Sequence, residues 1–248
     1  MCCLFLAASS TVAIAQTNVV DLVNPIIGTN GMGHTFPGAC VPFGLVQLSP
    51  DTDTIPHNVD GKYQPRSYEY CAGYQHKDSS IVGFSHTHFS GTGHSDLGDI
   101  LIMPTTGTLK LNPGTATNPD GGYRSRFSHG TEISRPGYYE VMLTDYGVKA
   151  QLTTTQRVGI HKYTYPTNSE NQRIILDMIH GIYNYDGKVL WTNIRVENDT
   201  LVTGYRITNG WARTNYTYFA MSFSKPITHY GCEEKAKVNY RGGYAKFN

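Results

Sequence analysis

The chain has 248 residues with a formal net charge of +1, and only 16% of its residues are charged. Lysine and arginine do not gather in clusters, which argues against nucleic acid as a partner because phosphate binding requires a basic face. A chain of this length holds one large all-β domain or two smaller ones. Its 18 tyrosines suit half-buried sheet surfaces, and we expect most of them to fill sheets, although tyrosine also stacks on sugars.

Residues 1–15 have the features of an export signal. Residues 4–14 form an apolar core, and Ala13-Ile14-Ala15 is an A-x-A cleavage site. The core is too short to cross a bilayer, so we expect no membrane span and a periplasmic or secreted protein. Residues 16–22 form a polar lead-in. Three cysteines remain once the signal is removed, namely Cys40, Cys71 and Cys232. Their number is odd and their pairing stays open.

Glycine and proline dominate residues 23–53 and exclude a helix there. One short strand, residues 45–48, is predicted within this loop-rich segment. A dinucleotide-binding loop would need a strand before such glycines and a helix after them, and neither is predicted. Residues 55–67 are polar and expected to be irregular.

The densest group of hydrogen-bonding side chains lies in residues 83–99, GFSHTHFSGTGHSDLGD. We expect a polar loop between two buried strands, residues 81–82 and 100–103. It contains three histidines, His86, His88 and His94. An H-x-H pair on a strand points both rings to one face, so a zinc or iron site is one interpretation. The other, which we favour, is that these side chains bond to the loop's own backbone and to buried water.

From Gly122 onward the sequence reads as strands with turn residues between them. The predicted strands are residues 138–143, 148–155, 159–165, 173–178, 188–196, 201–208 and 216–223. Asp145-Tyr146-Gly147 and residues 197–200 are hairpin signals, and residues 148–153 alternate between apolar and polar as a half-buried strand does. This spacing predicts a sandwich or barrel. Residues 238–247 begin a further strand without a partner or stop, which indicates that the polypeptide is a fragment of something longer.

No complete catalytic group stands out. Glycoside hydrolysis needs an acid and a base carboxylate across the bond, and the candidates are Asp51, Asp53, Glu69, Asp78, Asp96 and Asp99. Asp51 and Asp53 are expected on a turn, and Asp99 is expected to bond locally. A serine nucleophile elbow requires G-x-S-x-G, and the second glycine is missing around Ser85. Three tyrosines near Cys71, namely Tyr68, Tyr70 and Tyr74, form either a sugar-stacking platform or a cluster packed against the sheet.

Three long segments resemble the N-terminal domain of glycoside hydrolase family 92. They are GTNGMGHTFPGACVPFGLVQLSPDT, CAGYQHKDSSIVGFSHTHFSGTGHSDLGDILIMPTTG and YRSRFSHGTEISRPGYYEVMLTDYGVKAQLTTTQRVGIHKY. The family consists of exported bacterial α-mannosidases, common in gut organisms that consume N-glycans. The resemblance runs from about Val23 to the end of the chain.

The resemblance implies an all-β fold over residues 23–248, an antiparallel β-sandwich of the galactose-mutarotase-like (supersandwich) type with long loops in its N-terminal third. It implies a calcium-dependent inverting exo-α-mannosidase acting on mannose-containing N-glycans, with the active site between the sandwich and a C-terminal (α/α)6 domain of the same protein. The acid, the base and the calcium site belong mainly to that domain. These residues do not contain it, so the chain is interpreted as truncated and inactive alone, with no catalytic residue or metal ligand assigned.

The resemblance also implies which loops of the sandwich reach the sugar. By position, the GHTFPGA loop (residues 33–39) and the aromatic segment around Tyr70 contribute, while the histidines of FSHTHFSGTG shape the interface. The expected substrate-binding residues are His34, Thr35, Phe36, Tyr70, Cys71 and Tyr74. Many relatives carry tryptophan where this chain has Tyr70, a difference that bears on the preferred linkage or leaving group. The alternatives are a freestanding carbohydrate-binding module using Tyr68, Tyr70 and Tyr74, or a metalloenzyme built on His86, His88 and His94.

Overall fold

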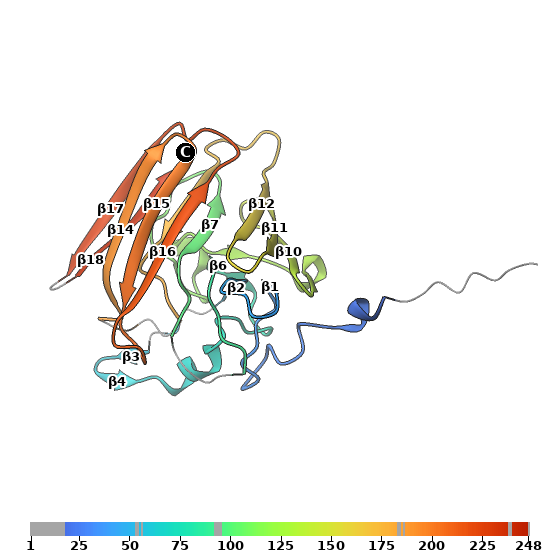
Figure 1. Cartoon of the computed structure of the whole chain (residues 1–248). Helices are drawn as coiled ribbons and strands as arrows, with labels where there is room; N and C mark the ends of the chain where they lie inside the picture. Colours follow the sequence, from blue (N-terminus) through green and yellow to red (C-terminus); the bar gives the residue numbers. More distant parts are fainter. Residues whose placement is uncertain are drawn as a thin grey trace, which may run out of the picture.

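A computed structural model describes residues 18–52, 55, 57–91, 96–182, 185, 187–237 and 240–247, with side chains to Cys232 (Figure 1). The predicted export signal lies outside these residues. The strands and 3-10 helices (η) follow one another along the chain in this order: η1 (Val19–Leu22), β1 (Ala39–Cys40), β2 (Gln47–Asp51), β3 (Asn58–Val59), β4 (Lys62–Tyr63), η2 (Pro65–Tyr70), β5 (Ser80–Ile81), β6 (Gly83–Ser85), β7 (Leu101–Thr105), η3 (Pro119–Gly121), β8 (Ser125–Arg126), η4 (His129–Thr131), β9 (Ile133–Arg135), β10 (Tyr138–Leu143), β11 (Val148–Thr154), β12 (Gly159–Thr164), β13 (Arg173–Asp177), β14 (Val189–Asn198), β15 (Leu201–Thr208), β16 (Asn215–Ser222), β17 (Tyr230–Lys237) and β18 (Tyr240–Phe247).

The strands form three main antiparallel sheets. A seven-stranded sheet has the order β1-β2-β6-β7-β13-β18-β17, a four-stranded sheet the order β12-β11-β10-β9, and a three-stranded sheet the order β14-β15-β16. Two small two-stranded sheets, β3-β4 and β5-β8, complete the fold. The predicted all-β sandwich is therefore confirmed.

Both faces of the central sheet are covered at β7 and β13. Leu101 of β7 belongs to the main core, together with Leu152 of the four-stranded sheet. Its neighbour Ile102 belongs to a second core, against Ile194 and Phe219 of the three-stranded sheet. Successive side chains of a strand point to opposite faces, so these two cores lie on opposite sides of β7. Figure 1 shows β14–β16 on the left and β10–β12 on the right, with β7 between them.

The later strands lie where the sequence predicts them, to within one or two residues. The hairpins β10–β11 and β14–β15 turn at the predicted residues, and Val148, Ala150 and Leu152 of β11 are buried as predicted. Ile81, Val82 and the strand β7 are buried as well, and the polar loop between them begins after Ser85, because β6 pairs with β2 and β7.

Three predictions about elements were wrong. The early strand covers Gln47–Asp51 instead of residues 45–48, because pairing with β6 fixes its register, and Asp51 is therefore in a strand and not on a turn. The polar segment 55–67 contains the β3–β4 hairpin. The last strand does have partners, because β18 pairs with β17 and with β13.

Two further observations concern the predictions about the cysteines and about a membrane span. The three described cysteines, Cys40, Cys71 and Cys232, form no disulfide with one another. Within the part of the chain that the structure describes, no helix is long and apolar enough to cross a membrane.

Candidate functional site

Three segments meet at the carboxylate of Asp51, which ends β2 and is buried. Oδ1 of Asp51 lies 2.8 Å from Nε2 of His88, in the loop after β6, and Oδ2 lies 2.9 Å from Nε2 of His180, after β13. Burial alone would raise the pKa of Asp51, but the charges and hydrogen bonds of His88 and His180 hold it well below its ordinary value. The ionised carboxylate thus links two loops that are far apart in the sequence.

His88 is held on both sides of its ring. Nδ1 lies 2.7 Å from the main-chain oxygen of Gln47, and Nε2 faces Asp51, with Oγ of Ser85 at 3.1 Å. Both ring nitrogens therefore lie beside protein oxygens. The ring of Phe36 packs on the ring of His88, with centroids 5.3 Å apart. The GHTFPGA loop therefore rests on this buried pair.

A second buried ion pair lies on the strand β15. Nε of Arg206 is 2.9 Å from Oδ1 of Asp99, and both side chains are buried. Nη1 of Arg206 donates to the main-chain oxygen of His180 at 2.6 Å, while Oδ2 of Asp99 accepts from the hydroxyl of Thr87. Arg206 thereby fixes the His180 loop relative to the loop after β6.

Lys188 is buried near this pair. Its Nζ donates to the main-chain oxygen of Ile182, and burial together with the charge of Arg206 lowers the pKa of Lys188 to about 7. A lysine in such surroundings exchanges its proton near neutral pH. The whole group is thus a network of ionisable side chains beneath the loops, with main-chain oxygens as further hydrogen-bond partners.

The GHTFPGA loop lies over the network. His34 is buried and adopts a left-handed conformation with φ of 50°, and its Nε2 has no hydrogen-bond partner among the described residues. Its ring meets the edge of Tyr68 at 5.0 Å between centroids. Thr35 donates its hydroxyl to the main-chain oxygen of Ile27.

The aromatic segment is buried rather than open. Tyr70 donates its hydroxyl to Asp78, the thiol of Cys71 lies 3.0 Å from the main-chain oxygen of Tyr68, and Tyr74 donates to Glu132. Of the three tyrosines, Tyr68 alone is exposed, by 39%. The side chains of Tyr70 and Tyr74 are therefore packed inside the protein, which favours the interpretation of a cluster packed against the sheet. Their contact with a sugar stays a prediction.

The histidines of the H-x-H pair do not converge on one point. His88 faces Asp51, whereas Nε2 of His86 lies 3.0 Å from Nε2 of His161 on β12, and Nδ1 of His86 faces the main-chain oxygen of Ile100. His94 lies outside the described residues. Both rings that can be placed bond to protein groups, but mainly to groups outside the loop, namely Gln47 and Asp51 for His88 and Ile100 and His161 for His86. The favoured interpretation, bonding to the loop's own backbone, was therefore wrong about the partners.

The candidate carboxylates that the structure describes are each bonded to protein groups. Asp51 and Asp99 belong to the network, and Asp53 lies outside the described residues. Glu69 pairs with Lys77, Asp78 with Tyr70, and Asp96 accepts from the main-chain nitrogen of Trp211.

Sequence reasoning missed three members of the network: His180, Lys188 and Arg206. For Arg206 there was a signal, because it falls on the buried face of β15, in step with Val202 and Thr208. A charged residue at an inward position of a strand indicates a buried partner. His180 follows a buried strand in a short polar turn, which by itself does not mark it as a partner of Asp51.

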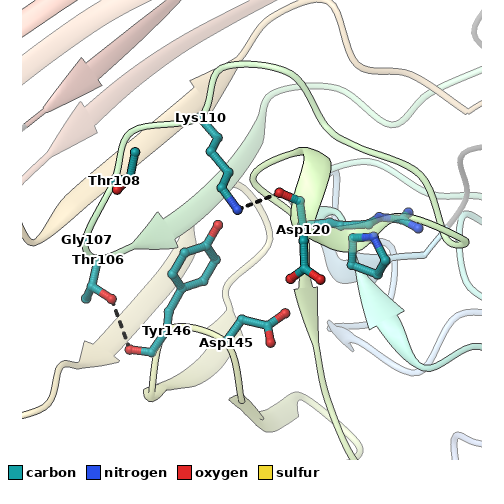
Figure 2. Close-up of a pocket in the computed structure, with 9 residues that line it drawn as sticks. Thr106, Gly107, Thr108, Lys110, Asp120, Asp145 and Tyr146 are labelled. Carbon is teal, nitrogen blue, oxygen red and sulfur yellow. Dashed lines mark hydrogen bonds between the residues drawn. The ribbon is translucent and has the colours of Figure 1, made fainter.

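A separate surface hollow of about 360 Å³ lies beside β7 (Figure 2). It is lined by Thr106, Gly107, Thr108, Lys110, Pro119, Asp120, Arg124, Asp145 and Tyr146. Asp120 and Asp145 both pair with Arg126, and Lys110 donates to the main-chain oxygen of Asp120. None of the six residues expected to bind sugar lines it.

The fold and this site define an antiparallel β-sandwich domain with paired, buried ionisable side chains beneath its loops. The model of the Glycosyl hydrolase family 92 N-terminal domain matches residues 22–247. The chain belongs to this family, as its sequence predicts.

Solved structures of family 92 proteins resemble this chain. The family GH92 alpha-mannosidase BT3965 from Bacteroides thetaiotaomicron, solved with mannoimidazole, is 40% identical over 92% of this chain and 30% of that chain, with a TM-score of 0.81. The gh92 family glycosyl hydrolase ccman5 is 22% identical over 93% of this chain and 30% of that chain, with a TM-score of 0.70, which supports the fold alone.

A fungal relative is more distant. An uncharacterized secreted glycosidase from Arthroderma benhamiae is 28% identical over 170 residues, which are 65% of this chain and 19% of that protein. The chain thus spans about 30% of the length of these solved relatives and 19% of this one.

Proposed function

We propose that this chain is the N-terminal β-sandwich part of an exported, calcium-dependent, inverting exo-α-mannosidase that acts on mannose-containing N-glycans. In this proposal its loops form one wall of the sugar pocket, at the interface with a C-terminal (α/α)6 domain. The observation that carries it is Nε2 of His34, which is buried, without a partner among the described residues, and placed in a loop that matches the α-mannosidase family. A buried, unpaired nitrogen is costly, and a sugar hydroxyl can satisfy it.

The network around Asp51 supports this role through rigidity. Binding that must order loops loses affinity to the entropy of ordering. Phe36 rests on His88, and the main-chain oxygen of His34 accepts from the main-chain nitrogen of Gly91 at 2.5 Å. The loop that bears His34 is therefore fixed by a ring contact with His88 and by a hydrogen bond with Gly91 before a sugar binds.

Calcium does not fit the described residues. Ca²⁺ takes six to eight oxygen ligands. Among the described residues, the one group of three or more His, Cys, Asp or Glu side chains with converging ligand atoms is His76, His129 and Glu132, which offers two nitrogens. The proposal therefore assigns calcium to the C-terminal domain, and we derive no step through it.

Inversion requires an acid and a base carboxylate separated widely enough to admit a water. The described candidate carboxylates are bonded to protein donors, so the proposal assigns the acid and the base to the C-terminal domain as well. Export is proposed from the predicted signal and from the similarity to a secreted glycosidase.

Complementation tests the proposal. The chain is fused to the C-terminal part of the Bacteroides thetaiotaomicron relative, and mannose release from an aryl α-mannoside is measured with calcium and with a chelator. We expect release by the fusion, with β-mannose as the first product, loss of release with chelator, and no release by either part alone.

The wall itself is tested by His34→Ala in the same fusion. Loss of one hydrogen bond to a sugar hydroxyl predicts a fall in kcat/KM of about 10- to 100-fold, whereas His229→Ala, at an exposed position, leaves kcat/KM unchanged. Mannose release by the 248-residue chain alone, or full activity of His34→Ala, would contradict the proposal.

A further inference from the structure

We propose that His76, His129 and Glu132 bind a transition-metal ion of the zinc class. The three residues come from two segments, because His76 lies in the loop before β5 whereas His129 begins η4 and Glu132 follows it. Their ligand atoms all lie within 4.8 Å of one another. Oε2 of Glu132 is 2.7 Å from Nδ1 of His129, and the two imidazole rings lie 4.0 Å apart between centroids.

The carboxylate of Glu132 is oriented by two tyrosines. Oε1 accepts from the hydroxyl of Tyr139 at 2.6 Å and from the hydroxyl of Tyr74 at 2.9 Å. Both hydroxyls therefore donate to the same carboxylate oxygen. Hydrogen bonds of this kind fix ligating carboxylates in metal sites.

Charge also favours a cation here. The side chain of Glu132 is 3% exposed, and its one ion-pair partner in the described part of the chain is the ring of His129. A buried carboxylate is stable only with a compensating charge. A bound divalent ion supplies that charge.

The donor set selects the metal. Two imidazole nitrogens and one carboxylate oxygen suit Zn²⁺, Ni²⁺ or Cu²⁺, whereas Ca²⁺ and Mg²⁺ prefer oxygens alone. The side chain of His129 is 38% exposed, so an ion from solvent can reach the site. The ion ties the loop of Tyr74 and His76 to η4. Its role is structural and independent of the proposed glycosidase activity.

Metal titration of the purified chain without a histidine tag tests this site. We expect one Co²⁺ per chain with visible absorption bands, displacement by Zn²⁺ and not by Ca²⁺, and a higher Tm with Zn²⁺. His129→Ala, which removes an exposed side chain, loses saturable Co²⁺ binding, while His229→Ala, at an exposed position after β16, retains it.

A second variant separates the site from a general effect on folding. Tyr139→Phe removes one orienting hydrogen bond and keeps all three ligands, so the metal affinity falls by about 10- to 100-fold while circular dichroism stays unchanged. Absence of saturable Co²⁺ binding in the wild type, or equal binding by His129→Ala and His229→Ala, overturns the proposal.

Discussion

Gly73 shows how one backbone position makes room for the buried network. Its φ is +80°, and a Cβ added there would lie 2.0 Å from Oδ1 of Asp51 and 3.2 Å from Cδ2 of His88. The carboxylate therefore occupies the space that any other side chain would require. Only glycine combines this conformation with so close an approach.

Gly73→Ala is expected to lower the free energy of unfolding by more than the backbone strain at a positive φ would by itself. Gly61→Ala is the matched control, because Gly61 has φ of +77° and nothing within 4 Å of an added Cβ. We expect the control to cost about 1–2 kcal/mol and Gly73→Ala about 1–3 kcal/mol more, measured by urea unfolding. Equal costs for the two variants would show that the network tolerates displacement of Asp51.

The pair His86 and His161 is neutral in the folded protein. Nδ1 of His86 donates to the main-chain oxygen of Ile100 at 2.7 Å, and Nδ1 of His161 lies 2.7 Å from the hydroxyl of Tyr163. Their Nε2 atoms face each other, so one donates and the other accepts. Burial lowers the pKa of His86 to about 4, and that of His161 well below its ordinary value.

Acid is therefore expected to destabilise the protein before the carboxylates titrate. The unfolded chain binds protons at both histidines near pH 6.5, and the folded chain does not, so the free energy of unfolding falls as the pH drops from about 6.5 towards 4. The charges of His88, Asp99 and Asp51 also act on His86. The pKa of Asp51 is lowered as well, so its own contribution is lost only below its unfolded value of 3.8.

Urea unfolding between pH 7.5 and 4.5 measures this slope, about 1.4 kcal/mol per pH unit for each proton. His161→Gln keeps a donor for His86 and removes one titrating ring, so its slope is shallower, whereas His229→Gln leaves the slope unchanged. A wild-type stability that stays flat across this range would rule out the neutral pair.

The sequence predicts that residues 83–99 carry a dense polar group, but it does not identify the partners. The histidines bond to Asp51 at a separation of 37 residues for His88 and 129 residues for His180. Such pairs are set by how the sheets pack, which periodicity within one strand does not encode. The GHTFPGA loop is predictable from its glycines and from family resemblance, and the unpaired nitrogen of His34 is visible only in three dimensions.

Elements differ in how clearly their pattern shows which faces are buried. In β11 alternate residues are buried, which predicts one covered face, and the structure agrees. All five residues of β7 are buried, as a continuous apolar run predicts for a strand covered on both faces. The two-residue strands β1, β5 and β8 carry no pattern, since their strand conformation comes from partners elsewhere in the chain.

Adjacent substitutions in β7 test the two cores. Leu101→Ala and Ile102→Ala each remove a buried side chain, from opposite faces, so each is expected to cost about 2–5 kcal/mol. Lys162→Ala, at an exposed position of β12, stays within about 0.5 kcal/mol of the wild type. Urea unfolding measures all three, and a negligible effect of Ile102→Ala would mean that the three-stranded sheet does not cover β7.

At the scale of the whole molecule, the spacing of strands predicts the all-β class, and the three-layer arrangement emerges only from the structure. Which face of β14–β16 meets β7 depends on residues such as Ile194 and Phe219, and their alternation is compatible with packing against any apolar surface. The strand order of the seven-stranded sheet is likewise largely non-local, because the neighbours β2 and β6, β7 and β13, and β13 and β18 do not follow one another in the sequence.

Exposed apolar side chains give the last prediction. Phe43 is fully exposed and Trp211 is 77% exposed, and apolar surface of this kind promotes association. We expect the chain alone to be poorly soluble and to associate in light scattering. Phe43→Ser combined with Trp211→Ser is expected to raise the soluble concentration without a change in Tm, because neither side chain supports the cores, while Lys225→Ser, at an exposed polar position, gives no gain. A wild-type chain that stays monodisperse at high concentration would count against a role for these residues in association.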